Sequence, residues 1–391
     1  MTDAERSHRL DGKRVLLVED DEVDRRRVHR AVKKAGVDMK IVDAEDVTSG
    51  CEAIAGDSFD CAVIDYNLPD GTALDLLAFI SGAGGHDVPV VVLTGEDDDR
   101  RAIEALQAGA EDYLVKNDFE IDAFFRAVRY AIQRHRLRRD LEETNARLQR
   151  ELEIGGNIQT SILPRELGVE GLDIAARMIP ATEVGGDYYD VLPETWGCWL
   201  AVGDVAGHGM GAAIVALMTQ SAIASLTRAR PSAPPSEIVA LTNEVLYENI
   251  RHRLTQDEHV TLTLLRYEHG GRLVHAGAHE ELIIYRAARG ACEIVMTPGT
   301  WLGARSDIQS VTSDREVFLD PGDVLVLYTD GITEAMNDQG EQYGLDRLVQ
   351  MLERTKDEPA IAIHARIWSD VKRWMDVQDD DVTLVVIRRV T

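Results

Sequence analysis

Aspartates stand beside glycines at several points in the second half of the chain. VGGDYYDV holds Asp187 and Asp190, GDVAGHGMGAA holds Asp204, YTDG holds Asp330, and QDDDVTLVV opens with aspartates 379–381. Asp and Gly are poor strand formers, so their place in otherwise strand-like runs indicates a need for the carboxylates. Four carboxylates converging from strand ends can hold two divalent cations, which activate a water and clamp a phosphoryl group.

Taken alone, each of these motifs is also compatible with an ordinary turn or cap, and TDG most of all. The recurrence of all four in this order favours one shared site. The adjacent glycines favour it further, because they let the backbone approach a cation closely enough for a carbonyl to serve as a ligand.

A second group of chemically capable residues lies in the first third of the chain, directly after apolar runs. Glu19 and Asp20 follow RVLLV, Asp65 ends CAVID, Thr94 ends PVVVLT, and Lys116 follows DYLV. Carboxyl ends of parallel strands carry the functional sites of doubly wound sheets. Three carboxylates at one edge repel each other unless a hard cation such as Mg²⁺ neutralises them. Alone, Asp65 is compatible with a turn cap and Lys116 with a solvated charge.

Two different patterns of strands and helices must position these groups. Residues 13–129 alternate five short apolar runs with amphipathic helices, which predicts an α/β doubly wound domain with a five-stranded parallel sheet. In residues 164–391, strand-like runs surround a pair of consecutive helices, which predicts an α+β sandwich. The apolar stretch GAAIVALMTQSAIASL is interrupted by polar residues 219–221 and is expected to be a buried helix, with no membrane span.

Residues 130–163 form a stretch rich in Arg, Glu and Leu, which predicts a helical coiled-coil linker. The apolar positions at heptad-like spacing are Leu137, Leu141, Leu148 and Leu152. Gly155 and Gly156 are expected to interrupt the helix and Pro164 to end it. A homodimer through parallel linker helices would cover the leucines; a lone solvated helix is the alternative.

Composition excludes several classes of protein. The 391 residues carry a formal charge of −27, which argues against nucleic acid as a partner. The four cysteines show no C-x-x-C pairing, so neither a zinc site nor a disulfide framework is indicated, and a reducing cytoplasmic location is expected.

On these residues, 13–129 resembles a response-regulator receiver domain of two-component signalling. The resemblance implies a sensor histidine kinase as partner and Asp65 as the phospho-accepting aspartate. It further implies an acidic pocket that binds Mg²⁺ and a switch beside it. The pocket and switch residues would be Glu19, Asp20 and the Asn67 carbonyl for Mg²⁺, Thr94 and Lys116 for the phosphoryl group, and Tyr113 as the aromatic that reorients with Thr94.

The order V-G-G-D-x-x-D, G-D-V-x-G-H-G, Y-T-D-G-I-T-E-A, D-D-V-T-L resembles the PPM class of metal-dependent serine/threonine phosphatases, in its SpoIIE/RsbU-like branch. The resemblance implies an αββα sandwich and two Mn²⁺ or Mg²⁺ ions. Asp187 would hold one ion, Asp204 would bridge both with the Val205 carbonyl, and Asp330 and Asp380 would hold the second. The implied substrate is a phosphoserine or phosphothreonine protein, often an anti-sigma-factor antagonist in a partner-switching pathway.

Three residues and two other functions stay open. HAGAHEEL stands where relatives read A-G-H-P, so His279 is expected to be structural rather than catalytic. His208, in a Gly-rich turn, is expected to be a loop residue, with a general acid as the alternative, and Asp190 has no assigned role. An adaptor that binds a sigma factor or its regulator without catalysis is one alternative, which the intact aspartates disfavour. A serine kinase is the other, but no G-x-x-x-x-G-K-[ST] loop is present.

Overall fold

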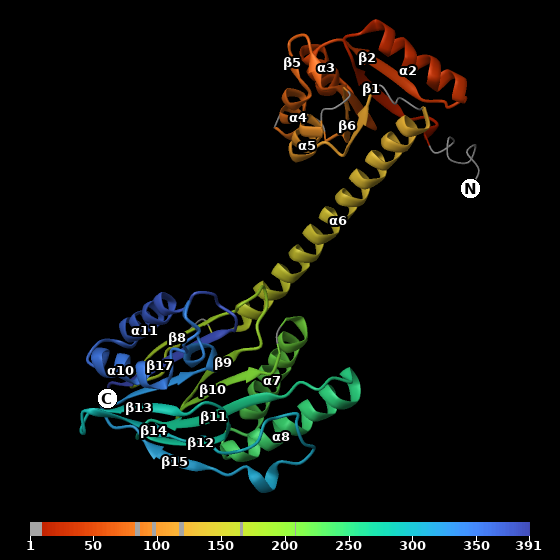
Figure 1. The fold of residues 1–391 in the computed structure, drawn as a ribbon. Helices are drawn as coiled ribbons and strands as arrows, with labels where there is room; N and C mark the ends of the chain where they lie inside the picture. Colours follow the sequence, from red (N-terminus) through yellow and green to blue (C-terminus); the bar gives the residue numbers. More distant parts are fainter. Residues whose placement is uncertain (1–9, 83–86, 96–98, 117–120, 165–166, 208) are drawn as a thin grey trace. The chain divides into compact units, whose positions relative to one another are not determined.

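The structure is a computed structural model that describes residues 10–82, 87–95, 99–116, 121–164, 167–207 and 209–391 (Figure 1). The chain forms two compact units, Met1–Arg147 and Leu148–Thr391. Each unit has its own apolar cores, two in the first and three in the second.

Five parallel strands build the sheet of the first unit, in the order β2-β1-β3-β6-β7. These strands are β1 (Arg14–Val18), β2 (Lys40–Ala44), β3 (Cys61–Asp65), β6 (Val90–Thr94) and β7 (Asp112–Val115). The other elements are α2 (Glu22–Ala35), α3 (Val47–Gly56), β4 (Asn67–Leu68), β5 (Gly71–Thr72), α4 (Ala73–Ser81), α5 (Asp99–Gln107) and the start of α6 (Ile121–Ile162). The predicted doubly wound fold is confirmed.

The central strands of this sheet are apolar up to their last residues, Asp65 and Thr94, because helices cover both faces. All five residues of β3 and of β6 are buried. A cap at the edge of the sheet fixes where α2 begins: the Asp21 carboxylate accepts hydrogen bonds from the backbone N–H of Val23 and Asp24, at 2.6 and 3.3 Å. This start of α2 leaves Glu19 and Asp20 at the carboxyl end of β1.

The 42-residue helix α6 runs through Gly155 and Gly156, so the expected interruption there is wrong. A Cβ built on Gly156 would lie 1.9 Å from the backbone oxygen of Glu183, and one on Gly155 would lie 2.9 Å from the Met210 side chain. The glycines therefore permit close packing within the second unit, which outweighs their low helix propensity.

The leucines of α6 leave an apolar stripe in the single chain. Leu137, Leu141 and Leu148 are 60%, 61% and 51% exposed. Closer to its start, α6 is fixed to the first unit, where the Arg138 guanidinium lies 2.9 Å from the carboxylate of buried Glu111.

Two antiparallel sheets form the centre of the second unit. The first, in the order β15-β12-β11-β10-β9, contains β9 (Tyr188–Glu194), β10 (Gly197–Val205), β11 (Val260–Glu268), β12 (Arg272–Ala278) and β15 (Arg315–Phe318). The second, in the order β14-β13-β16-β17-β8, contains β8 (Leu172–Ile179), β13 (Leu282–Arg286), β14 (Ala291–Val295), β16 (Val324–Tyr328) and β17 (Val382–Arg389).

Helices cover the outer face of each sheet (Figure 1). The first sheet carries α7 (Met210–Ala229), α8 (Pro235–Tyr247) and the π-helix η2 (Glu248–Leu254), and the second carries α10 (Leu345–Thr355) and α11 (Ala360–Trp374). The short helices η3 (Gln309–Val311) and α9 (Asp330–Thr333) complete the unit. One apolar cluster fills each helix–sheet interface and a third lies between the sheets, so the predicted αββα sandwich is confirmed.

Among the described residues, α7 is the one helix whose length and composition would suit a membrane span. Its residues Ala212, Val215, Ala216 and Ile223 belong to the core beneath the first sheet. These contacts identify α7 as a core helix, as the sequence predicts.

Candidate active site

The four predicted aspartates of the second unit come together from both sheets. Asp187 immediately precedes β9 and Asp204 is the penultimate residue of β10, in the first sheet. In the second sheet, Asp330 opens α9 two residues after the end of β16, and Asp380 lies two residues before β17. The carboxylate of Asp204 interacts electrostatically with those of Asp330, Asp380 and Asp381, and Asp187 interacts with Asp204. The site therefore spans the sandwich at one end of the two sheets.

Asp187 is the most enclosed of these carboxylates, at 2% exposed. Its Oδ2 accepts hydrogen bonds from the hydroxyls of Thr329, at 2.8 Å, and Thr383, at 2.6 Å. Burial raises the pKa of Asp187 well above its ordinary value, and the charge of Asp204 adds to this rise. The two threonines belong to the YTDG and DDVTL motifs, so each motif supplies a positioning hydroxyl as well as a carboxylate.

Asp204 lies at the centre of the negative charge. Burial raises its pKa to about 7, with further contributions from Asp330, Asp380 and Asp381. Burial also raises the pKa of Asp330, with the charge of Asp380 acting in the same direction. Within the described part of the chain, no Lys or Arg forms an ion pair with any of these aspartates. A cluster of this kind favours the binding of cations, because the cations supply the positive charge that offsets the repulsion between the carboxylates.

The glycines beside the aspartates are required because neighbouring atoms leave no room for a Cβ. A Cβ on Gly185 would lie 2.5 Å from the Asp381 carboxylate, and one on Gly186 would lie 2.8 Å from the backbone oxygen of Val205. A Cβ on Gly331 would lie 1.9 Å from the backbone oxygen of Asp381. The paired glycines of VGGD thus allow the loop before Asp187 to pack against Val205 and Asp381.

Asp380 and Asp381 have different surroundings, which their adjacency in the sequence does not reveal. Asp381 is buried, and its carboxylate accepts hydrogen bonds from the backbone N–H of Ala181, at 2.7 Å, and of Gly186. Asp380 is exposed, and its Oδ1 accepts the N–H of Asp381 at 2.8 Å. Asp381 therefore fixes the loop before Asp187, whereas Asp380 is solvent-exposed at the site and interacts with Asp204 and Asp330.

His279 directly follows β12, and its ring contacts β11 and β16. Its Nε2 lies 2.9 Å from the carbonyl oxygen of Tyr328, and its Nδ1 lies 2.8 Å from the Thr261 hydroxyl. Because a carbonyl can only accept, Nε2 carries the proton and Nδ1 accepts from Thr261. Burial lowers the pKa of His279 to about 4, so the ring is neutral near pH 7. These contacts give His279 a structural position between Thr261 of β11, which pairs with Asp204 of β10, and β16, the strand that leads to Asp330.

The remaining motif residues lie elsewhere. Asp190 is buried on β9, where its carboxylate accepts the N–H of Val191 at 2.9 Å and lies 3.4 Å from the Tyr188 hydroxyl. Gln220 of α7 also hydrogen-bonds Asp190. Asp190 is thus held against α7, away from the carboxylates of the cluster. His208 lies outside the described residues.

Two groups near the site escaped the sequence reasoning. Glu280, in the HAGAHEEL segment, has a pKa raised to about 7 by burial, with Asp330 contributing. Gln159, near the end of α6, is 5% exposed and hydrogen-bonds both backbone polar groups of Gly185 in the VGGD loop: its Nε2 donates to Gly185 O at 2.6 Å, and its Oε1 accepts from Gly185 N at 3.0 Å. The sequence did carry one signal for Gln159, because this polar residue lies on the apolar side of the linker helix.

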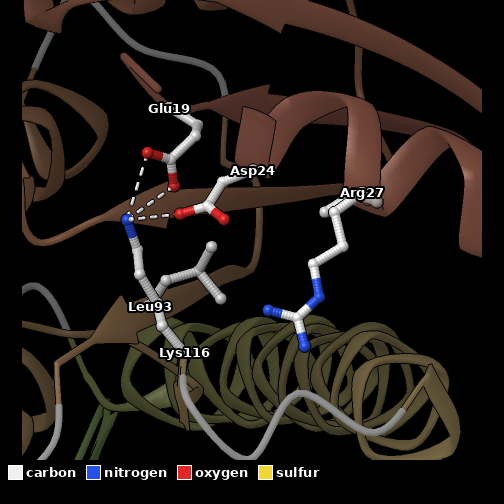
Figure 2. A pocket seen from close by; sticks show the side chains of 6 residues that line it. Glu19, Asp24, Arg27, Leu93 and Lys116 are labelled. Atoms are coloured by element: carbon white, nitrogen blue, oxygen red, sulfur yellow. Dashed lines mark hydrogen bonds and ion pairs between the residues drawn. The ribbon is translucent and has the colours of Figure 1, made fainter. Parts of the chain in front are cut away.

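In the first unit, Glu19, Asp20 and Asp65 each offer an oxygen, and these oxygens lie within 4.8 Å of one another. The ammonium of Lys116 lies 2.8 Å from Glu19 Oε2 and 2.8 Å from Asp65 Oδ2. Figure 2 shows Lys116 reaching toward Glu19 and Asp24, with Leu93 beside it. Burial raises the pKa values of Glu19 and Asp65, while their ion pairs with Lys116 oppose that rise.

The other predicted pocket residues lie around this group. Thr94 is buried at the end of β6, and its carbonyl accepts the N–H of Lys116 at 2.8 Å. Tyr113, on β7, is 36% exposed. Asn67 is exposed in β4, two residues after Asp65.

Comparisons with known proteins agree with this geometry. The model of the Stage II sporulation protein E (SpoIIE) family matches residues 195–390, and that of the response regulator receiver domain matches residues 15–129. Phosphoserine phosphatase RsbU of Bacillus subtilis is 28% identical over 287 residues, covering 71% of this chain and 81% of RsbU.

Two further matches cover one unit each. The KDP operon transcriptional regulatory protein KdpE of Escherichia coli is 34% identical over 121 residues, which are 31% of this chain and 52% of KdpE. This chain thus spans about half the length of that relative. The SiaA-PP2C domain of Pseudomonas aeruginosa superposes with a TM-score of 0.55 at 23% identity, over 63% of this chain and 98% of that domain.

An αββα sandwich with aspartates gathered at its strand ends, joined to a receiver domain, defines a PPM-class metal-dependent protein phosphatase under regulatory control. The match of the SpoIIE model to residues 195–390 covers half of the sequence and assigns the family. The chain belongs to the SpoIIE family.

Proposed function

We propose that the chain is a response regulator whose phosphorylation at Asp65 controls a two-metal protein serine/threonine phosphatase. The observation that carries the proposal is the convergence of Asp187, Asp204, Asp330 and Asp380 with no Lys or Arg partner among the described residues. Hard divalent cations suit such a set of oxygen donors.

In this proposal Asp187 would hold one Mn²⁺ or Mg²⁺ ion, Asp330 and Asp380 would hold a second, and Asp204 with the Val205 carbonyl would help to hold both. When bound, the two ions lower the pKa of a water and neutralise charge on the phosphoryl group. Hydrolysis forms one bond between the water oxygen and phosphorus and breaks the bond from phosphorus to the serine oxygen. The serine oxygen takes up a proton, and inorganic phosphate leaves.

The chain's own residues prepare this site before substrate arrives. The hydroxyls of Thr329 and Thr383 orient the Asp187 carboxylate, and Asp381 holds the peptide of Gly186. Gly186 leaves room for the Val205 carbonyl to face the site. Fixed ligands of this kind reduce the reorganisation that charge development would otherwise require.

For the first unit we propose that Asp65 accepts the phosphoryl group from a sensor histidine kinase. Glu19, Asp20 and the Asn67 carbonyl would bind Mg²⁺, and Lys116 would move from its ion pair with Asp65 to the phosphoryl oxygens. Thr94 would bind a phosphoryl oxygen, and half-exposed Tyr113 would follow it. The present proximity of Lys116 and Asp65, at 2.8 Å, supports this assignment.

We further propose that α6 carries the signal. Its leucine stripe would pair with that of a second chain, and its last turns hold the loop before Asp187 through Gln159. A change in linker packing would then alter the loop, which meets the requirement for two states that differ at both sites.

The substrate we propose is a phosphoserine or phosphothreonine protein, specifically an anti-sigma-factor antagonist in a cytoplasmic partner-switching pathway. The similarity to the phosphoserine phosphatase RsbU supports it. The proposed domain limits are 13–129 for the receiver, 130–163 for the linker and 164–391 for the phosphatase.

The experiment that tests the function is phosphate release from a phosphoserine peptide and from p-nitrophenyl phosphate, with and without added Mn²⁺. Metal-dependent release from both supports the proposal. An adaptor without catalysis would release phosphate from neither.

A further inference from the structure

A segment of the second unit crosses the end of the first sheet at which Asp204 lies. This segment, residues 296–303 and here called the strap, is fixed to two neighbouring strands. The hydroxyl of Thr297 donates to the backbone oxygen of His279, just beyond β12. Leu302 pairs with Val260 of β11 through two backbone hydrogen bonds, at 2.9 and 2.8 Å.

Buried polar contacts hold the far end of the strap. Asn243 of α8 is fully buried, and its Oδ1 accepts the N–H of Gly303 at 2.9 Å while its Nδ2 donates to Arg305 O at 2.9 Å. The Arg251 side chain donates to Gly303 O at 3.0 Å. The strap is therefore set in one conformation by its own domain.

Despite this anchoring, the strap exposes two large apolar side chains, Met296 at 60% and Trp301 at 50%. The Trp301 indole stacks on the His259 ring, with centroids 4.5 Å apart and planes 18° from parallel. The neighbouring residue Leu302 already fills the core and is 1% exposed. Packing therefore does not account for the outward indole.

His259 connects this aromatic pair to the active site. Its backbone oxygen accepts the N–H of Ala206 at 2.9 Å, two residues after Asp204. The strap is separated from the end of β10 by β11. Two strand spacings therefore place Trp301 about 10 Å from the end of β10, where Asp204 lies. A phosphoryl group held by the aspartates would not reach the indole, but a polypeptide that carries it would, about three residues away.

We propose that His259 and Trp301 form a docking platform for an apolar side chain of the phosphoprotein substrate, about three residues from its phosphoserine. The inference rests on the proposed phosphatase function. A rigid, half-exposed indole beside a reaction centre is suited to this role, because Trp supplies a large contact area with little loss of rotamer freedom.

The test uses eleven-residue phosphoserine peptides in an alanine background, with a single Leu or Phe placed at each flanking position in turn. Wild type should hydrolyse a peptide with the apolar residue three or four positions from the phosphoserine about tenfold better in kcat/KM than the all-alanine peptide. Trp301→Ala should abolish that preference, and Trp301→Phe should retain most of it.

Phe318→Ala is the matched control, because Phe318 is 53% exposed on the edge strand β15. It should keep the peptide preference, and all variants should hydrolyse p-nitrophenyl phosphate with Mn²⁺ as wild type does. A wild type without positional preference, or a Trp301→Ala variant that keeps it, overturns the platform while leaving the phosphatase function intact. A wild type that releases no phosphate from any substrate overturns the phosphatase function itself.

Discussion

Gly186→Ala is a single added methyl group whose effect follows from the close packing of the VGGD loop. The new Cβ would lie 2.8 Å from Val205 O and 3.4 Å from Asp204 Oδ1. An ordinary contact between carbon and oxygen is several tenths of an ångström longer than the first of these distances. Val205 O belongs to the backbone and Gly186 is buried, so the loop or the end of β10 must move.

Overpacking of this kind costs about 1–3 kcal/mol of folding free energy. The larger effect should fall on metal binding, because the Val205 carbonyl and the Asp204 carboxylate are both displaced. Loss of about 1.4 kcal/mol in that binding raises the half-saturating Mn²⁺ concentration tenfold. The assay is a Mn²⁺ titration of p-nitrophenyl phosphate hydrolysis, beside urea unfolding of each variant.

Gly270→Ala is the control, because a Cβ at Gly270 meets nothing within 4 Å and the residue does not have a positive φ. It should match wild type in both measurements. A Gly186→Ala variant with the wild-type Mn²⁺ requirement would refute the idea that this glycine makes room for the Val205 carbonyl.

Three further predictions concern other parts of the chain. Asp65→Ala should abolish labelling by acetyl phosphate, as measured by intact mass, whereas a phosphoryl group found on another residue would contradict the receiver assignment. Leu141→Asp with Leu148→Asp should give a monomer in sedimentation and a weaker response of phosphatase turnover to beryllofluoride; a dimer with the full response would exclude signalling through α6. His275 is buried with neither ring nitrogen hydrogen-bonded, and burial lowers its pKa to about 4. Between about pH 6.5 and 4 the unfolded state therefore binds a proton that the folded state does not, and stability falls as the pH falls. His275→Phe should remove about 2 kcal/mol of the stability lost between pH 7 and pH 5, measured by urea unfolding; an unchanged pH dependence would show that His275 does not titrate in this way.

The fold was predictable because its signals are local. Five apolar runs separated by amphipathic helices are sufficient to predict the parallel sheet of the first unit, and runs such as WLAVGDV read as strands buried on both faces. The prediction for Gly155 and Gly156 was wrong because helix propensity is a weak preference that tertiary packing overrides. The atom that requires glycine there belongs to Glu183, which the local pattern cannot reveal.

The part of the site that lies at the ends of strands was predictable from the sequence. The structure brings together the four aspartates that the motifs single out, while their roles as metal ligands stay predictions. The separate surroundings of Asp380 and Asp381 depend on which backbone N–H groups lie opposite, 195 or more residues away in the case of Asp381. The hydrogen bonds between Gln159 and Gly185 and the position of His279 likewise depend on contacts between distant segments.

The most direct test of the central claim is the Mn²⁺-dependent phosphatase turnover of Asp204→Asn, compared with Asp379→Asn at the exposed residue next to Asp380. On the proposed function Asp204 is shared by two dications, and a neutral amide cannot replace such a carboxylate, so Asp204→Asn should retain less than about a hundredth of wild-type turnover, a loss of several kcal/mol in transition-state stabilisation. Asp379→Asn should stay within about twofold of wild type, since tenfold corresponds to 1.36 kcal/mol. A folded Asp204→Asn variant that keeps more than about a tenth of wild-type turnover would contradict the two-metal account.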